Sequence, residues 1–252
     1  MINIILSGCN GKMGQVITKL IEENEETKIV CGFDINTTRL NDYPVCKTPD
    51  EFKGSADVII DFSHPSSLSS LLAFAQNKNI PIVVATTGLT SLQIKELTLA
   101  SKNIPVFFSA NYSLGVNLMI DLVTRAAKFL EESFDIEIIE KHHNLKIDAP
   151  SGTALAIADA IADSLTKPTE YVYDRHSVRK KRDKKEIGIH AVRGGTIVGE
   201  HSVIFAGQDE VIEVMHQATS KEVFAVGSVR AAKFLASRSK GLYSMKDLIN
   251  SL

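Results

Sequence analysis

The first 112 residues alternate short apolar runs with segments whose apolar residues recur at helical spacing. The apolar runs are rich in isoleucine and valine, which is typical of buried strands. They are Ile2–Ser7, Lys28–Asp34, Val58–Ser63, Pro81–Ala85 and Pro105–Ala110. The segments between them predict helices over Lys12–Glu23, Ser66–Asn77 and Ser91–Lys102. Because alternating strands and helices form βαβ units, this pattern predicts an α/β domain with a parallel sheet between two layers of helices.

The pattern changes after residue 112. It predicts helices over Gly115–Glu132 and Thr153–Leu165, and strands over Asp135–Lys141, Ile187–Arg193, Ile197–Phe205 and Val211–Ala218. Strands with little helix between them suit an open, mostly antiparallel sheet, which indicates a second domain of α+β type. Helical spacing returns over Glu222–Ser237. We therefore expect a first domain over 1–112, a second over 113–219, and a segment 220–252 that packs back on the first.

Composition and charge exclude several classes of protein. The chain has 252 residues, 44% of them hydrophobic and 23% charged, with a net charge of −2. This balance gives no reason to expect nucleic acid or an anionic membrane as a partner. No apolar stretch approaches the roughly 20 residues of a membrane span, and the N-terminal run is too short for a signal peptide. Three cysteines without paired spacing favour a reducing compartment. These features predict a soluble cytoplasmic protein.

One basic run, Arg179–Lys185, interrupts the second half of the chain. The first interpretation is a solvated loop between elements of the sheet. A second is a basic rim that steers an acidic substrate toward its site. Nucleic-acid binding is a weaker third, because the run lacks basic surroundings and interleaved aromatic residues.

A glycine-rich turn, GCNGKMG, follows the first predicted strand. It resembles the fingerprint of dinucleotide-binding domains: Gly8 permits the tight turn, Gly11 allows backbone to approach a pyrophosphate, and Gly14 lets helix and strand pack closely. The start of the following helix offers N–H groups to the phosphates. Asp34 ends the next strand about 20 residues later, where a carboxylate accepts the ribose hydroxyls. A purely structural turn is the alternative.

The same residues bear on the choice of cofactor. The Asp34 carboxylate should repel a 2′-phosphate, which favours NADH. Lys12 lies close enough to the ribose end to offer a compensating cation. We therefore expect the protein to use both NADH and NADPH, with NADH preferred.

Two further turns follow predicted strands of the first domain. They contain Ala85, Thr86 and Thr87, and Ser109, Ala110, Asn111 and Tyr112. Open α/β sheets bind ligands at the carboxyl ends of their strands, so these small and hydroxyl residues could approach the nicotinamide end of a dinucleotide. Simple strand-ending turns are the alternative.

The segment EKHHNLKIDAPSGTA concentrates groups suited to acid–base chemistry. His142, His143 and Lys146 could be metal ligands, solvated structural residues, or a proton-donating and anion-binding set. Adjacent histidines seldom face one ion and no nearby Cys or His completes a ligand set, so no metal is expected. Histidine exchanges protons near neutral pH, and lysine offers charge to a carboxylate or a developing anion.

A helix start follows these residues. Pro150 disfavours a helical residue before it, and Ser151-Gly152-Thr153 then opens an alanine-rich helix. Such a start suits N-capping, but it also presents N–H groups and hydroxyls to a carboxylate. Beside the histidines and the lysine, it suggests a small acidic substrate held by the helix end.

The chain resembles the 4-hydroxy-tetrahydrodipicolinate reductase (dihydrodipicolinate reductase) family nearly end to end. The resemblance is carried by GCNGKMG, DFSHP, ATTG, SANYSLGVN, EKHHNLKIDAPSGTA and VRGGTIVGEH. It implies a cytoplasmic enzyme of the diaminopimelate route to lysine. That enzyme transfers hydride from NAD(P)H to a cyclic, unsaturated dicarboxylate imine, with loss of water, to give tetrahydrodipicolinate. The fold implied is a Rossmann-type domain plus a mixed-sheet domain that binds substrate and forms a homotetramer.

The resemblance also assigns roles by position. His142 corresponds to the catalytic acid/base, and Lys146 to a second catalytic residue that donates a proton or stabilises charge at the ring nitrogen. The substrate contacts implied are His143, Ser151, Gly152 and Thr153. The cofactor contacts implied are Gly8, Cys9, Asn10, Gly11, Lys12, Met13, Asp34, Ala85, Thr86, Thr87, Ser109, Ala110, Asn111 and Tyr112.

Two departures from the family pattern affect specificity. Ile35 and Asn36 follow Asp34 where some members carry a basic residue, which weakens the case for strict NADPH use. Leu145 replaces a third histidine found in some members, which removes one polar substrate contact. Two other functions share the glycine turn: an NAD-dependent dehydrogenase of another small acid or sugar, and a non-catalytic NAD(H)-sensing protein. Neither needs the histidine–lysine segment.

Overall fold

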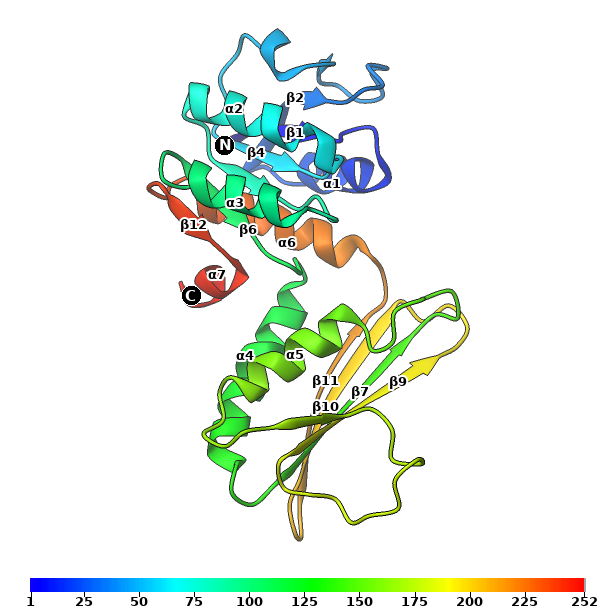
Figure 1. The fold of residues 1–252 in the computed structure, drawn as a ribbon. Coiled ribbons are helices and arrows are strands. Elements are labelled where there is room, and N and C mark those ends of the chain that lie inside the picture. The colour runs from blue at the N-terminus through cyan, green and yellow to red at the C-terminus, as the bar shows by residue number, and fades with distance from the viewer. Residues whose placement is uncertain (252) are drawn as a thin grey trace. The chain divides into compact units, whose positions relative to one another are not determined.

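The computed structural model describes residues 1–251. It divides into two compact units (Figure 1). Unit 1 comprises Met1–Leu114 together with the segment that begins at Glu222, and unit 2 comprises Gly115–Lys221. Within residues 1–251, no helix is both long enough and apolar enough to cross a membrane.

Unit 1 contains a seven-stranded sheet in which every pairing is parallel, in the order β12-β6-β5-β4-β1-β2-β3. Five of these strands match the predicted ones: β1 Ile2–Ser7, β2 Thr27–Phe33, β4 Val58–Asp61, β5 Ile82–Val84 and β6 Pro105–Phe108. The sequence pattern missed β3 (Val45–Cys46) and β12 (Gly241–Tyr243). Both are short edge strands, and two or three residues carry too little periodicity to be recognised.

Helices cover both faces of this sheet, as the alternation predicted (Figure 1). Side chains of successive strand residues point to opposite faces, so Ile4 and Leu6 join one core cluster and Ile5 joins the other. The first cluster includes residues of α1, α6 and α7, and the second includes residues of α2 and α3. The bounds are α1 Lys12–Glu22, α2 Leu68–Lys78, α3 Ser91–Ala100, α6 Glu222–Leu235 and α7 Met245–Ile249, with 3₁₀ turns at Pro49–Glu51 and Pro65–Ser67.

Unit 2 contains a five-stranded sheet in the order β11-β10-β7-β9-β8. Its strands are β7 Asp135–His142, β8 Glu170–Val172, β9 Glu186–Arg193, β10 Gly199–Ala206 and β11 Val211–Ala218, and its helices are α4 Leu114–Leu130 and α5 Gly152–Ala162. Apolar residues of α4 and α5 pack on one face of the sheet. Among them, Val123 and Ile157 contribute fully buried side chains.

The sheet of unit 2 is mixed, so the prediction of a mostly antiparallel sheet from the hydrophobic pattern was wrong. β10 pairs antiparallel with β7 and β11, but β9 pairs parallel with β7 and β8. The chain passes through α5 between β7 and β8, and such a helical crossover returns the next strand in the same direction. The loop 173–185 then leads to β9, which lies between β7 and β8 and runs parallel to both. Periodicity identifies strands but not their partners, which explains the error.

The basic run 179–185 is a largely exposed loop between β8 and β9, as the first interpretation predicted, and it also forms ion pairs with the sheet. Arg182 is only 18% exposed and forms ion pairs with Asp135 and Glu137 at the start of β7. Lys180 pairs with Glu186, whose carboxylate is buried at the start of β9. The run therefore holds together the starts of two neighbouring strands, at the opposite end from the His142 segment.

Candidate active site

The predicted dinucleotide contacts of unit 1 lie at one edge of its sheet. The glycine turn follows β1, Asp34 follows β2, the segment 85–87 follows β5, and 109–112 follows β6. The strands are parallel, so their carboxyl ends meet at the same edge. β1 lies between β2 and β4, where the strand order changes direction. This is the position at which open α/β sheets bind ligands.

The three glycines of this turn occupy different backbone environments. Gly8 has φ +79°, a left-handed conformation that favours glycine. A Cβ on Gly14 would collide with backbone atoms of Gly8 and Cys9. Gly11 is the N-cap of α1, and no side chain among the described residues caps it. Since the first turn of a helix leaves N–H groups without helical partners, the start of α1 suits a phosphate.

Asp34 and Asn10 connect this turn to the loop after β2. The Asp34 carboxylate accepts hydrogen bonds from the backbone N–H groups of Asn10 and Asn36, each at 3.0 Å. The Asn10 amide donates to the carbonyl oxygens of Asn36 (2.7 Å) and Thr38 (2.9 Å). Its own Oδ1 is buried and accepts no hydrogen bond from residues 1–251. Asn10 Oδ1, an acceptor without a partner, lies beside the uncapped start of α1, and this arrangement is consistent with a dinucleotide site.

Asp61, at the end of β4, is a buried carboxylate at the same edge of the sheet that the sequence reasoning did not single out. Its side chain is fully buried and accepts hydrogen bonds from Ser63 Oγ (2.5 Å) and Thr86 Oγ1 (2.7 Å). Burial raises the pKa of this carboxyl, although these bonds and one from Ser7 oppose the shift. Asp61 therefore ties together the ends of β1, β4 and β5. The DFSHP motif contained this signal, but only as part of the family resemblance.

Two of the predicted cofactor contacts have side chains that point into the core. Cys9 is fully buried, and a Cβ on Gly32 would meet its sulfur. The Tyr112 hydroxyl donates to the carbonyl oxygen of Val84 at 2.8 Å, within the core. Burial raises the pKa of Tyr112 well above its usual value. At these two positions only the backbone is available to a cofactor.

In unit 2, the predicted catalytic residues lie where a buried apolar face becomes polar. Alternate residues of β7 are buried: Ile136 and Ile138 first, then Glu140 and His142. Strand geometry places these four side chains on one face. The sequence pattern placed Glu140 near the end of the predicted strand Asp135–Lys141 and gave it no further role, whereas its carboxylate is fully buried.

The Glu140 carboxylate accepts four hydrogen bonds. His142 Nδ1 lies 2.6 Å from Oε2, and Arg193 contributes Nη1 to Oε2 (2.8 Å) and Nη2 to Oε1 (2.7 Å). The backbone N–H of Ser151 donates to Oε1 at 3.0 Å. Burial alone would raise the pKa of Glu140, but the hydrogen bonds from Arg193 and His142 lower it below its usual value.

The motif VRGGTIVGEH surrounds His142 from the neighbouring strands. The N–H of Gly194 donates to the carbonyl oxygen of His142 at 2.9 Å. A Cβ on Gly199 would lie 3.1 Å from His142 Nε2, so glycine leaves room for the ring. The ring of His201 meets that of His142 edge to face, with centroids 5.2 Å apart. The sequence pattern gave this motif no role beyond the family resemblance, whereas the structure shows that its residues surround His142.

The start of α5 is capped as expected. Ser151 Oγ accepts a hydrogen bond from the N–H of Ala154 at 3.1 Å and lies 3.0 Å from His201 Nε2. Gly152 is exposed, and a Cβ there would meet no described atom within 4 Å. Thr153 occupies the next position of the helix. Open space beside the helix start leaves room for a bound carboxylate.

Lys146 and His143 lie in the loop between β7 and α5. Lys146 Nζ pairs with Asp148 Oδ1 at 2.8 Å, and this hydrogen bond lowers the pKa of Asp148. His143 Nδ1 is buried and has no hydrogen-bond partner among residues 1–251. Leu145 is 82% exposed. The loop therefore offers one ammonium group and one open histidine nitrogen.

We expect His201 to make unit 2 sensitive to acid. Burial, with a smaller repulsion from His142, lowers the pKa of His201 to about 4. The unfolded chain binds this proton near pH 6.5. The contribution of His201 to stability is therefore complete above about pH 6.5, and up to about 3 kcal/mol of it is lost as the pH falls to about 4.

Urea unfolding of the wild type and His201→Gln over this pH range measures the effect. The variant should lose less stability between neutral and acidic pH than the wild type does. His176→Gln, which changes an exposed histidine, is the matched control and should keep the wild-type slope. Equal slopes for the wild type and His201→Gln would contradict the prediction.

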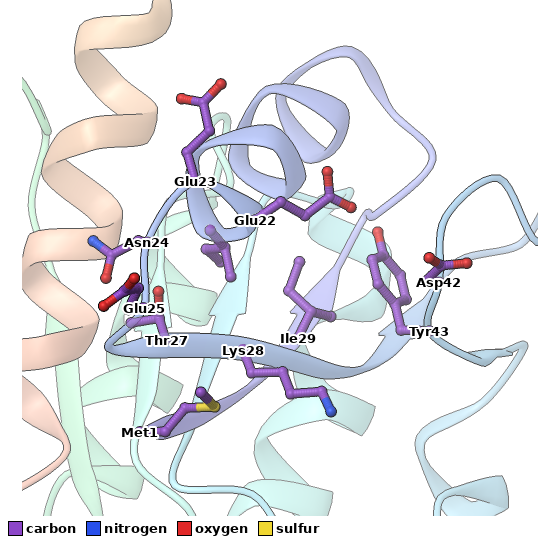
Figure 2. A pocket seen from close by; sticks show the side chains of 11 residues that line it. Met1, Glu22, Glu23, Asn24, Glu25, Thr27, Lys28, Ile29, Asp42 and Tyr43 are labelled. Carbon is purple, nitrogen blue, oxygen red and sulfur yellow. The ribbon is translucent and has the colours of Figure 1, made fainter.

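A hollow of about 470 Å³ lies elsewhere in unit 1. Figure 2 shows it between the end of α1 and the start of β2, with Glu22, Glu23, Lys28 and Tyr43 among its lining residues. It is at the amino ends of the strands, the edge opposite the glycine turn, and none of the predicted site residues lines it. Residues 1–251 contain no group of three or more His, Cys, Asp or Glu side chains arranged to hold a metal ion.

Comparisons with known proteins agree over the whole chain. The family models "Dihydrodipicolinate reductase, N-terminus" and "Dihydrodipicolinate reductase, C-terminus" match residues 2–112 and 115–249. The 4-hydroxy-tetrahydrodipicolinate reductase of Caldanaerobacter subterraneus subsp. tengcongensis is 56% identical over 249 residues, which cover 99% of this chain and 98% of that protein. The enzyme of the same name from Clostridium tetani is 47% identical and covers 100% and 98%.

A solved structure gives the same result. The dipicolinate-bound dihydrodipicolinate reductase from Paenisporosarcina sp. TG-14 aligns with a TM-score of 0.83 and 25% identity, over 100% of both chains. The comparisons confirm the predicted fold class and function: an NAD(P)H-dependent oxidoreductase, 4-hydroxy-tetrahydrodipicolinate reductase, of lysine and diaminopimelate biosynthesis. The chain belongs to the dihydrodipicolinate reductase family.

Proposed function

We propose that unit 1 binds NAD(P)H at its glycine turn, and that unit 2 binds and protonates the cyclic dicarboxylate substrate. The observation that carries this proposal is the placement of His142 beside the start of α5. His142 is hydrogen-bonded to a buried carboxylate, and the same carboxylate holds the N–H of Ser151. One buried carboxylate thus positions both a proton-exchanging ring and a helix start suited to an anion.

The substrate is held, in this proposal, by one of its carboxylates at the start of α5. The start of α5, formed by Ser151, Gly152 and Thr153, is the positive end of the helix dipole, which favours a carboxylate. His143 Nδ1, which is buried and has no hydrogen-bond partner among residues 1–251, supplies a further polar contact. Dipicolinate, the ligand named for the Paenisporosarcina structure, is itself a cyclic dicarboxylate.

The reduction consumes one proton for each hydride transferred and releases water. His142 is the acid/base that handles a proton, since its Nδ1 is committed to Glu140 and its Nε2 remains for exchange. Lys146 now pairs with Asp148. Because Asp148 is an exposed partner, Lys146 can exchange it for the substrate, where its ammonium group donates a proton or stabilises negative charge at the ring nitrogen.

The dinucleotide supplies the hydride when it is bound. The uncapped start of α1 suits its pyrophosphate, and the Asp34 carboxylate suits the hydroxyls of the adenosine ribose. Asp34 also repels a 2′-phosphate, and the exposed residues after it, Ile35 and Asn36, supply no cation. Exposed Lys12, at the first position of α1, is the cation of this turn that could compensate. These features support dual use with NADH preferred.

We also propose a cytoplasmic homotetramer assembled through the sheet of unit 2. Helices α4 and α5 pack on one face of that sheet. On the opposite face, the edge strand β11 exposes Val211 (64%) and Met215 (58%). Apolar side chains exposed on an edge strand mark a surface suited to association.

The decisive test is oxidation of NADH, followed by its absorbance, with the product of a coupled dihydrodipicolinate synthase as substrate. We expect turnover with both NADH and NADPH, and a higher kcat/KM with NADH. The matched control omits the synthase and should show no oxidation. Absence of turnover with either cofactor would contradict the proposed function, whereas a hundredfold preference for NADPH would contradict only the cofactor assignment.

A further inference from the structure

We propose that Glu140, held in place by Arg193, is the positioning residue that fixes the orientation and the protonated nitrogen of His142. The inference rests on the proposed role of His142 as acid/base. Glu140 is two residues before His142 on β7, so both side chains lie on the helix-covered face of the sheet. The 2.6 Å separation of Glu140 Oε2 and His142 Nδ1 is that of a strong, charge-assisted hydrogen bond.

The donors around Glu140 determine where the ring carries its hydrogen. An ionised carboxylate only accepts hydrogen bonds. Arg193 supplies two donors and the backbone of Ser151 a third, all of which keep the carboxylate ionised. His142 Nδ1 must therefore carry the hydrogen of the fourth bond. In the neutral ring this leaves Nε2 as the unprotonated nitrogen, ready to receive a proton and return it.

Arg193 has a second function in this arrangement. Its guanidinium donates to both oxygens of Glu140 and to the carbonyl oxygen of Asp148, at 2.5 Å. It therefore links β9 to β7 and to the loop that carries Lys146. The positive charge of Arg193 also offsets the negative charge of Glu140. The carboxylate therefore orients His142 without removing its proton.

The other titratable groups near Glu140 and His142 do not supply the hydrogen bond that Glu140 makes to the ring. His201 of β10 contacts the ring of His142, but it is a buried neutral histidine near pH 7 that bonds Ser151 Oγ. His216 of β11 lies beyond His201 on the same face. In the loop, the charge of Lys146 is paired with Asp148. Glu140 is thus the one carboxylate, among the described residues, that is hydrogen-bonded to His142.

The test uses the full-length enzyme with 15N-labelled histidine. Nitrogen NMR of His142 should show hydrogen on Nδ1 in the neutral wild-type ring, and a mixture with hydrogen on Nε2 in Glu140→Gln. We expect kcat of this variant to fall about 10- to 100-fold while KM for NADH stays unchanged. The pH–rate profile of the variant should also differ from that of the wild type, because an amide replaces the carboxylate as the hydrogen-bond partner of the ring.

A matched control exists in the same sheet. Glu137 pairs with His190 (2.8 Å) and with Arg175 and Arg182, which repeats the same chemistry at the other end of β7. Glu137→Gln should leave the His142 signals and the pH–rate profile as in the wild type. The double variant Glu140→Gln/Arg193→Gln avoids an unpaired buried arginine, so it provides a folded comparison if the single variant unfolds.

The outcomes separate this inference from the proposed function. If His142→Gln is inactive but Glu140→Gln and the double variant keep the wild-type tautomer and pH–rate profile, the positioning role is overturned and the proposed function stands. If Glu140→Gln changes the tautomer while His142→Gln remains fully active, the geometry is right but the proposed function fails.

Discussion

Replacing His142 by glutamine is expected to lower kcat by about 10²- to 10⁴-fold, because the reaction loses its positioned acid/base. Glutamine keeps a polar side chain near the size of the ring but cannot exchange a proton at neutral pH. The residues of the glycine turn are untouched, so NADH binding, measured by fluorescence titration, should match the wild type. Steady-state turnover with both substrates supplies the second measurement.

Lys146→Met completes this experiment. Methionine retains the length of the side chain but removes the ammonium group, so both kcat and substrate affinity should fall. Lys141→Met is the matched control, since Lys141 pairs with Glu200 and is on the opposite face of β7. Turnover that is unchanged in both His142→Gln and Lys146→Met would refute the assigned roles.

Gly14→Ala is expected to destabilise unit 1 by about 3 kcal/mol, because the new Cβ would overlap rigid backbone rather than a mobile side chain. The carbonyl oxygen of Cys9 would lie 2.5 Å from it. Relief requires α1 to move away from β1, which also displaces the N–H groups proposed for the pyrophosphate. Urea unfolding and NADH titration should therefore both show a loss.

Gly11→Ala separates binding from folding. A Cβ on Gly11 would lie 3.3 Å from the carbonyl oxygen of Gly8, a contact relieved by a small shift, and its φ of −74° is ordinary for alanine. We expect near wild-type stability with weakened NADH binding, since the methyl group stands where backbone would approach the pyrophosphate. Tight NADH binding by Gly11→Ala, or wild-type stability of Gly14→Ala, would contradict this account of the turn.

Much of the candidate site follows from local sequence. The glycine turn is a seven-residue signal, and its separation from Asp34 reflects one helix and one strand. The capping role of Ser151 depends on residues within one helical turn. His142 and Lys146 stood out because their chemistry is concentrated in one short segment. Each of these features depends on contacts close in sequence, which spacing and residue type reveal.

The residues missed by sequence reasoning act across long separations. Arg193 reaches Glu140 over 53 positions, Ser151 Oγ reaches His201 over 50, and Thr86 reaches Asp61 over 25. Glu140 was assigned only to a predicted strand. The alternation of polar and apolar residues indicates the face of the sheet on which a side chain lies, but not the groups that contact that face. The structure alone shows that its carboxylate is enclosed and shared between His142 and Arg193.

The sequence by itself determined the parallel sheet of unit 1, the position of the glycine turn and the helix start at Ser151, and it predicted the roles of His142 and Lys146. The reason is that hydrophobic periodicity, glycine conformation and capping operate over a few residues. Only the tertiary structure decided that β9 runs parallel to β7, and this pairing places Arg193 beside His142. Strand partners are chosen by packing and chain crossover, so the groups that orient the predicted catalytic histidine became visible only in the folded chain.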